Sequence, residues 1–183
     1  MSDVADRFRN VAAQFSERAK AVSAAGWGST SPCEGWVARD IVRHIAAWMP
    51  SYFLGARGIE LPTVPSVDDD PVGVWEIVRD AIQSALDDPS ARSLRSRTSD
   101  EGWTLEEAVG AYGIGDILIH TWDLARATGQ DEALDVDEVR RLVRALNRPD
   151  ELILQNGHFA PSVNVPPDAN EQTKLLAMTG RTP

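Results

Sequence analysis

Apolar residues recur at three- and four-residue spacing along most of the chain, a pattern that predicts amphipathic helices. The first helix is expected from about Val4 to Val22, ahead of Gly26 and Gly28. A second apolar stripe follows the turn-like segment SPCEGW and consists of Val37, Ile41, His44, Ile45, Trp48 and Tyr52. The opposite face of that helix is charged, so we expect His44 on its buried side.

Proline and aspartate mark the next boundaries. The segment 55–73 contains LPTVPSVDDDP, shows no periodicity and is expected to be a long connecting loop. Asp70 followed by Pro71 predicts a helix start, because aspartate can cap the helix and proline loses no hydrogen bond at the first helical position. The stripe of this third helix is Trp75, Val78, Ile82 and Leu86. Pro89 is expected to end it.

The fourth helix is expected to be the longest. Thr104 and Glu107 have the spacing of a capping box at its start. The apolar pattern then runs from Leu105 towards Ala127, and Gly129 is the expected residue just beyond its end. One long helix is therefore predicted here.

Shorter helices are expected in the last third of the chain. Asp135 and Glu138 have capping-box spacing ahead of an apolar stripe that Pro149 ends, and Asp168 with Glu171 is expected to cap a final helix. Strand-like alternation and internal repeats are not evident. The pattern therefore predicts an all-α fold, a four-helix bundle with short C-terminal helices, in a single domain that covers residues 1–183.

Composition narrows the choice of partners. The chain has 18 basic and 28 acidic residues, a formal charge of −10, which disfavours nucleic acid and anionic membrane surfaces. The charged start MSDVADRFRN does not resemble a signal peptide, and no apolar run reaches the roughly 18 residues of a membrane span. The single cysteine, Cys33, rules out an internal disulfide framework. A cytoplasmic location is expected.

Three residues have the chemistry and placement of metal ligands. Asp116 and His120 are four residues apart in GIGDILIHTWDLARATG, so they share one helix face with Cβ atoms roughly 5–6 Å apart. His44, on the buried stripe of the second helix, can supply a third ligand. Three nitrogen or oxygen ligands with an open position are typical of a working metal centre, whereas structural zinc sites are normally closed by four.

Two interpretations of these residues stay open. In one, Asp116 and a histidine form a buried hydrogen-bonded pair. In the other, all three side chains bind a divalent cation that neutralises the carboxylate. Because the three groups come from two helices and all fall on predicted core faces, the pattern favours the metal site.

Several neighbours have both a structural and a functional interpretation. Gly113 and Gly115 permit either close helix packing or a bare backbone beside a substrate cavity. Asp123 is either solvated or an acceptor for a ligating histidine. Trp36, Trp48 and Trp122 are either core residues or a substrate platform.

His158 and Cys33 give weaker indications of function. His158 lies in the turn-like segment NGHFAP and would line a pocket only if the tail folds back over the bundle. Cys33 is expected to be a small, buried or half-buried thiol, since SPCEGW contains no evident base or cation that would activate it.

Three segments carry a family resemblance, SPCEGWVARDIVRHIAAW, GDILIHTWDLARATG and DANEQTKLLAMTGRTP. They resemble the DinB/YfiT-like superfamily, in the branch related to mycothiol-dependent maleylpyruvate isomerase, over nearly the whole chain. The resemblance implies a four-helix bundle with a divalent metal, zinc or alternatively nickel, held by His44, Asp116 and His120. The isomerase carries glutamate where this chain has Asp116, so this carboxylate reaches one methylene less far.

Two classes of function follow. The first is a metal-dependent transferase or isomerase, in which a low-molecular-weight thiol such as mycothiol binds the cation as thiolate and attacks an electrophilic small molecule. A metal-dependent hydrolase is a variant that needs a general base, and no residue is assigned a catalytic or thiol-binding role. The second class is a non-catalytic metal-binding or interaction module, with homodimer formation left open.

Overall fold

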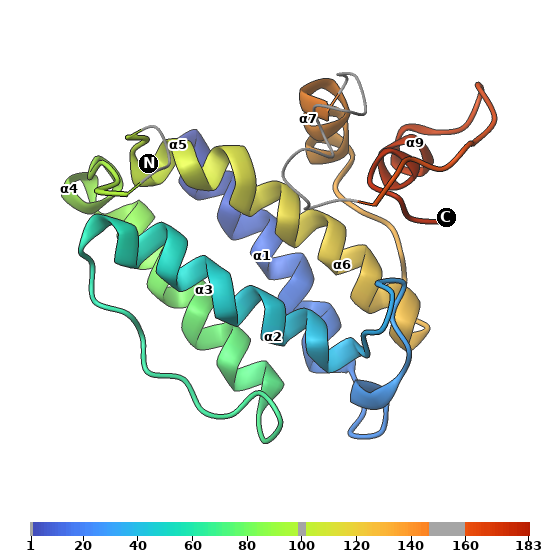
Figure 1. Cartoon of the computed structure of the whole chain (residues 1–183), viewed down its shortest axis with the longest axis horizontal. Helices are drawn as coiled ribbons and strands as arrows, with labels where there is room; N and C mark the ends of the chain where they lie inside the picture. Colours follow the sequence, from blue (N-terminus) through green and yellow to red (C-terminus); the bar gives the residue numbers. More distant parts are fainter. Residues whose placement is uncertain (1, 99–101, 147–159) are drawn as a thin grey trace.

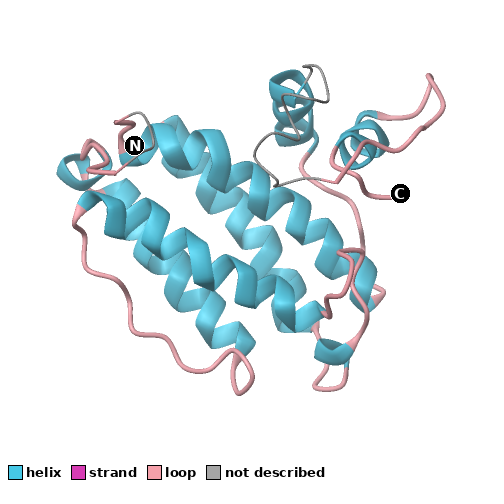
Figure 2. Ribbon diagram, viewed as in Figure 1, coloured by secondary structure: helices cyan, strands magenta, loops and turns pink. Residues whose placement is uncertain are grey.

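The computed structural model describes residues 2–98, 102–146 and 160–183. Within these ranges the regular structure is helical, apart from isolated β-bridges that join Thr30 to Val37 and Arg95 to Thr104. The all-α prediction is confirmed (Figure 2). None of the helices in the described ranges is long and apolar enough to cross a membrane.

Four long helices form the bundle (Figure 1). They are α1 (Asp3–Ala21), α2 (Ala38–Met49), α3 (Pro71–Asp87) and α6 (Ile114–Thr128). Both α1 and α2 pack against α3 and α6, so the four apolar faces enclose one core. Its largest fully buried side chains include Trp75, Trp122, Phe8, Phe15, Phe53, Ile41 and Ile45.

The predicted helix ends at Asp70, Thr104 and Gly129 are confirmed. The backbone N–H of Gly73 donates to Asp70 Oδ1 at 2.8 Å. Thr104 and Glu107 form the reciprocal capping box, with bonds of 3.1 and 2.8 Å. Gly129 has a φ of 68°, the left-handed conformation that glycine adopts at helix ends without strain.

The predicted helical run from Leu105 towards Ala127 is confirmed, but its geometry is not uniform. It consists of α5 (Leu105–Ala108), a π-helical turn, η4 (Val109–Gly113), and α6. The end of α2 likewise widens into a π-helical turn, η2 (Pro50–Leu54), followed by the 3₁₀ turn η3 (Gly55–Arg57). A π turn inserts one extra residue into the helix. Residues spaced four apart before η4 therefore do not lie on the same face as those spaced four apart after it.

The two π-helical turns pack against each other. A Cβ on Gly113 would lie 3.0 Å from Cζ of Phe53, so the glycine allows the closer approach. The buried Arg57 fastens the same region, since its Nη1 donates to the carbonyl of Tyr52 at 2.8 Å and its Nη2 to that of Trp103 at 2.9 Å. The close packing interpretation of Gly113 is therefore supported.

Shorter elements complete the chain. They are η1 (Gly26–Gly28), α4 (Pro89–Arg92), α7 (Val136–Leu146) and α9 (Glu171–Met178). The last two pack on each other beside α6, above the bundle in Figure 1. The expected stop at Pro149 lies outside the described residues.

Two predicted caps in the C-terminal part differ in the structure. Asp135 does cap α7, but the Glu138 carboxylate binds Arg7 of α1 through two bonds of 2.7 Å and does not complete a capping box. Asn170, not Asp168, caps α9 by accepting from the N–H of Thr173. In the first case Arg7 binds the carboxylate that would have completed the box, and in the second a neighbouring side chain takes the capping role that spacing assigned to Asp168.

Candidate metal centre

The three predicted ligands meet between α2 and α6. Nε2 of His44 and Nε2 of His120 each lie 3.6 Å from Oδ1 of Asp116. The centroids of the two imidazole rings are 5.0 Å apart. One ligand atom from each side chain can be chosen so that all three lie within 4.8 Å of one another. The residues that the sequence placed on two separate helices therefore converge on one point.

The spacing of these atoms distinguishes between the two interpretations left open by the sequence. Nitrogen–oxygen hydrogen bonds measure about 2.7–3.2 Å, so 3.6 Å is too long for a direct bond. Two ligands held about 2.1 Å from a tetrahedral cation stand roughly 3.4 Å apart. The observed separations are closer to that of ligands around a shared cation than to that of a hydrogen-bonded pair.

Asp116 has one oxygen without a partner. Its Oδ2 is buried and has no hydrogen bond within the described residues. A buried acceptor left in this state costs about 1–3 kcal/mol. The cluster therefore offers both an unused acceptor and an anionic charge to an incoming cation.

The ligands lie at the edge of the core. The side chain of Asp116 is 25% exposed and that of His44 is 33% exposed, whereas His120 is buried. The prediction that all three are on buried faces was thus correct only for His120. His44 lies on the border of its apolar stripe, next to the exposed Arg43 and Ala47. This position gives the site a side that solutes can reach.

A second carboxylate orients His120. Nδ1 of His120 lies 2.9 Å from Oδ2 of Asp123, whose side chain is fully buried, so the solvated interpretation of Asp123 was wrong. Arg181 holds the same carboxylate, with Nη2 2.8 Å from Oδ2 and Nε 3.2 Å from Oδ1. Because Nδ1 is engaged, Nε2 is the nitrogen of His120 that faces Asp116.

Charges in the cluster are strongly coupled. Burial alone would lower the pKa of His120, but Asp116 and Asp123 outweigh it and raise the pKa to about 10. Burial acts to raise the pKa of Asp116, yet His120 and His44 outweigh it and lower that pKa. A cation that binds at Nε2 of His120 must therefore displace a proton.

Cys33 is closer to this network than its local sequence indicated. Its Sγ lies 3.4 Å from Oδ2 of Asp123 and 3.7 Å from Nη2 of Arg181. Cys33, Asp123 and His120 form a second group whose side-chain atoms have the spacing of metal ligands. The guanidinium of Arg181 already supplies positive charge to that group, so the first group is the better cation site.

Aromatic rings flank the candidate ligands. The ring of Trp36 lies 5.3 Å from that of His44 and is stacked on that of His120 at 6.1 Å, while Trp48 lies 6.1 Å from His44. Both tryptophans are partly exposed, whereas Trp122 is a core residue. The core interpretation therefore fits Trp122, whereas Trp36 and Trp48 pack against the edge of the core and also lie beside the candidate ligands.

Gly115 does not leave a bare backbone next to the site. A Cβ there would lie 3.2 Å from Cδ1 of Leu142, so this glycine lets α7 approach α6. His158 lies outside the described residues.

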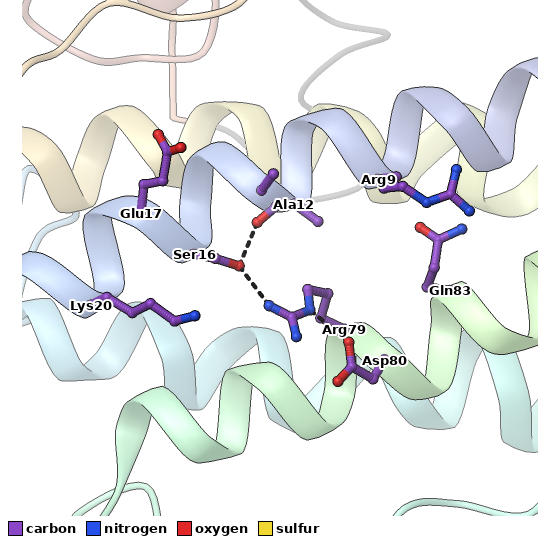
Figure 3. Close-up of a pocket in the computed structure, with 9 residues that line it drawn as sticks. Arg9, Ala12, Ser16, Glu17, Lys20, Arg79, Asp80 and Gln83 are labelled. Atoms are coloured by element: carbon purple, nitrogen blue, oxygen red, sulfur yellow. Dashed lines mark hydrogen bonds and ion pairs between the residues drawn. The ribbon is translucent and has the colours of Figure 1, made fainter.

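A separate pocket of about 440 Å³ lies between α1 and α3, and none of the candidate ligands lines it (Figure 3). Ser16 donates to the carbonyl of Ala12 at 2.7 Å and accepts from Arg79 at 3.0 Å. The basic side chains along it have acidic partners, such as Glu76 for Lys20 at 2.8 Å. This pocket therefore presents no free charge that would select a ligand.

The chain is similar to known proteins. A family model described as the mycothiol maleylpyruvate isomerase N-terminal domain matches residues 8–57, which include His44. Two uncharacterized proteins of Mycobacterium tuberculosis, MT0763 of strain CDC 1551 and Rv0738 of strain H37Rv, are each 30% identical over 163 residues, 85% of both chains compared. The chain belongs to the mycothiol maleylpyruvate isomerase N-terminal domain family. The comparison with solved structures gave no match.

Membership of this family confirms the resemblance drawn from the sequence. The matched region covers α2 and most of α1, and thus one of the two helices that carry candidate ligands. Asp116 and His120 lie beyond it, within the longer similarity to the mycobacterial proteins. Their assignment therefore rests on the geometry described above.

Proposed function

We propose that the protein binds a divalent cation, zinc in the first instance, through Nε2 of His44, the Asp116 carboxylate and Nε2 of His120. Carboxylate and imidazole ligands suit zinc and nickel alike. The unpartnered Oδ2 of Asp116 and the 3.6 Å spacings support this ligand set. We also propose that the bound metal is zinc and that the protein is located in the reducing cytoplasm, where a thiol stays free.

The proposed reaction class is transfer or isomerisation that depends on a low-molecular-weight thiol, with mycothiol suggested by the family. A bound cation would supply Lewis acidity that lowers the pKa of a thiol and so generates a nucleophilic thiolate. The substrate would be an electrophilic small molecule. The observation that carries the proposal is a group of only three ligands at an exposed edge, since a structural zinc ion normally has four protein ligands and three leave one position open.

The chain's own residues have distinct roles in this scheme. His44 and His120 would bind the cation, and Asp116 would offset its charge. Trp36 and Trp48 shield the imidazoles from one side and present apolar surface to a bound molecule. Cys33 would not be the nucleophile, because its thiol lies 3.4 Å from the Asp123 carboxylate oxygen that contacts Nδ1 of His120, and not at the Nε2 that would bind the cation.

A thiol titration tests this function. Cobalt-substituted protein is titrated with mycothiol, or with a simple thiol as a second probe, while the visible spectrum is recorded. We expect a sulfur-to-cobalt charge-transfer band that saturates with thiol and is absent from His120→Ala. Asp69→Asn, which alters an exposed loop carboxylate, is the matched control and should behave as the wild type.

Cys33→Ser separates the two sources of sulfur. If the band persists in this variant, the added thiol supplies the sulfur, as proposed. If the band forms without added thiol and disappears in Cys33→Ser, the proposed role of an external thiol is wrong. If no thiol changes the spectrum but chelation sharply lowers the melting temperature, the alternative of a non-catalytic metal-binding module replaces the enzyme.

A further inference from the structure

Arg181, the third residue from the C-terminal end, reaches the interior beside α6. Its side chain is only 12% exposed. Nη2 and Nε both donate to Asp123, at 2.8 and 3.2 Å, and Nη1 donates to the carbonyl of Thr179 at 2.9 Å. The guanidinium therefore has a fixed position relative to a carboxylate that itself holds His120.

The backbone before Arg181 is built to direct this side chain inward. Helix α9 ends in a Schellman-type turn, in which the N–H of Arg181 donates to the carbonyl of Leu176 at 2.9 Å and that of Gly180 to Ala177 at 3.0 Å. Gly180 has a φ of 79°, and a Cβ there would lie 2.5 Å from Cβ of Ala160. Glycine is thus required twice over at this position, for its conformation and for its lack of a side chain.

We propose that Arg181 is a positioning residue of the metal centre, which sets the orientation of His120 through Asp123. This inference rests on the proposed metal site. A histidine ligand needs its second nitrogen held by an acceptor, and that acceptor must itself be fixed. Asp123 is fully buried, and the described residues that hold its oxygens besides His120 are Arg181 and Cys33. Without the guanidinium, a buried carboxylate would be left to turn away from His120 or to draw in water.

General attachment of the C-terminal part does not explain Arg181. Helix α9 is held by other bonds, including Arg140 Nε to Glu171 at 2.9 Å and Gln172 Nε2 to the carbonyl of Glu132 at 2.9 Å. These contacts involve neither His120 nor Asp123. Arg181 alone among the described arginines donates to Asp123, so its loss should affect the site more than the fold.

The first test measures cobalt affinity by competition with a chromophoric chelator. Arg181→Ala should weaken binding about 10- to 100-fold, the usual effect of losing an outer-sphere partner of a ligating histidine. Arg181→Lys keeps the charge but not the two-point contact, and should fall between Arg181→Ala and the wild type. Arg140→Ala breaks an exposed ion pair of α7 with α9 and is the matched control, with unchanged affinity.

The second test needs no metal. The metal-free protein is labelled with nitrogen-15 so that the proton on Nδ1 of His120 can be observed by NMR. This proton should resonate downfield and exchange slowly with water, because it is buried in a hydrogen bond. The resonance should exchange faster or disappear in Arg181→Ala and persist in Arg140→Ala. Arg181→Lys should retain it in part, which shows that the effect is not unfolding.

These two readouts separate this inference from the proposed function. If the wild type binds no metal but the resonance depends on Arg181, the proposed function fails, while the finding that Arg181 orients His120 through Asp123 stands. If Arg181→Ala folds, binds cobalt as tightly as the wild type and keeps the His120 resonance, Arg181 has no positioning role.

Discussion

His120 and Asp123, three residues apart on α6, are joined inside the protein by a 2.9 Å contact between Nδ1 and Oδ2. This contact leaves Nε2 of His120 directed at Asp116, 3.6 Å away. One imidazole thus lies between two carboxylates, one buried and one at the surface edge. The acid–base behaviour of the metal-free protein should follow from this arrangement.

Metal-free protein should be most stable in mildly acid solution. The pKa of His120 is raised from 6.5 to about 10, so its contribution to stability is complete below pH 6.5 and is lost as pH rises through 10. The pKa of Asp123 is lowered from 3.8 to about 2, because His120 and Arg181 outweigh the effect of burial, so its contribution is complete above pH 3.8 and is lost as pH falls from there through 2. Both contributions are therefore present between roughly pH 4 and 6.5.

Urea unfolding in the presence of a chelator checks this pH dependence. Between pH 5.5 and 8.5 the wild type should lose on the order of 2 kcal/mol more than His120→Gln, since each pH unit above 6.5 contributes at most about 1.4 kcal/mol. Equal losses in the two proteins would show that His120 is not held as an imidazolium in the folded state.

The pair of Arg7 and Glu138 should stabilise the junction of α7 with the bundle. Glu138 is buried and accepts two bonds of 2.7 Å from Arg7. Glu138→Gln removes the buried counter-charge of Arg7 and leaves only the exposed Asp3, 3.6 Å away, so it should cost about 2 kcal/mol in urea unfolding. Glu171→Gln, which breaks the exposed pair with Arg140, should cost less than about 0.5 kcal/mol. Similar costs for the two variants would contradict a special role for the buried pair.

Gly113 should tolerate no added methyl group. In an ordinary helix, replacing glycine by alanine stabilises by up to about 1 kcal/mol. At Gly113, however, the new Cβ would lie 3.0 Å from Phe53, so we expect Gly113→Ala to lower stability by about 1–3 kcal/mol. Gly28→Ala is the control, because a Cβ there has no neighbour within 4 Å. A Gly113→Ala protein more stable than the wild type would show that η4 can relax.

Local patterns were sufficient to predict much of the fold and the candidate ligands. The caps at Asp70 and Thr104 and the glycine at Gly129 depend on contacts within a few residues, which the sequence displays directly. The His44, Asp116 and His120 group could be found because ligand-type residues interrupt apolar stripes. Each of these signals has a short range along the chain.

Other features depend on contacts that no local pattern encodes. The π turn at Val109–Gly113 packs against Phe53, which lies 60 positions before Gly113 in the sequence. The environment of Cys33 depends on Arg181, which is 148 residues away. The only signal for Arg181 was an arginine placed just after a helix-ending glycine, and that pattern is usually found at a surface.

The central claim is that His44, Asp116 and His120 form a metal site, and elemental analysis of protein purified without a histidine tag tests it most directly. The account predicts close to one equivalent of a divalent metal per chain in the wild type and in Asp69→Asn. Asp116→Ala and His44→Ala should each retain only a small fraction of that metal. Folded wild-type protein that holds no stoichiometric metal, even after reconstitution with zinc or nickel, would contradict it.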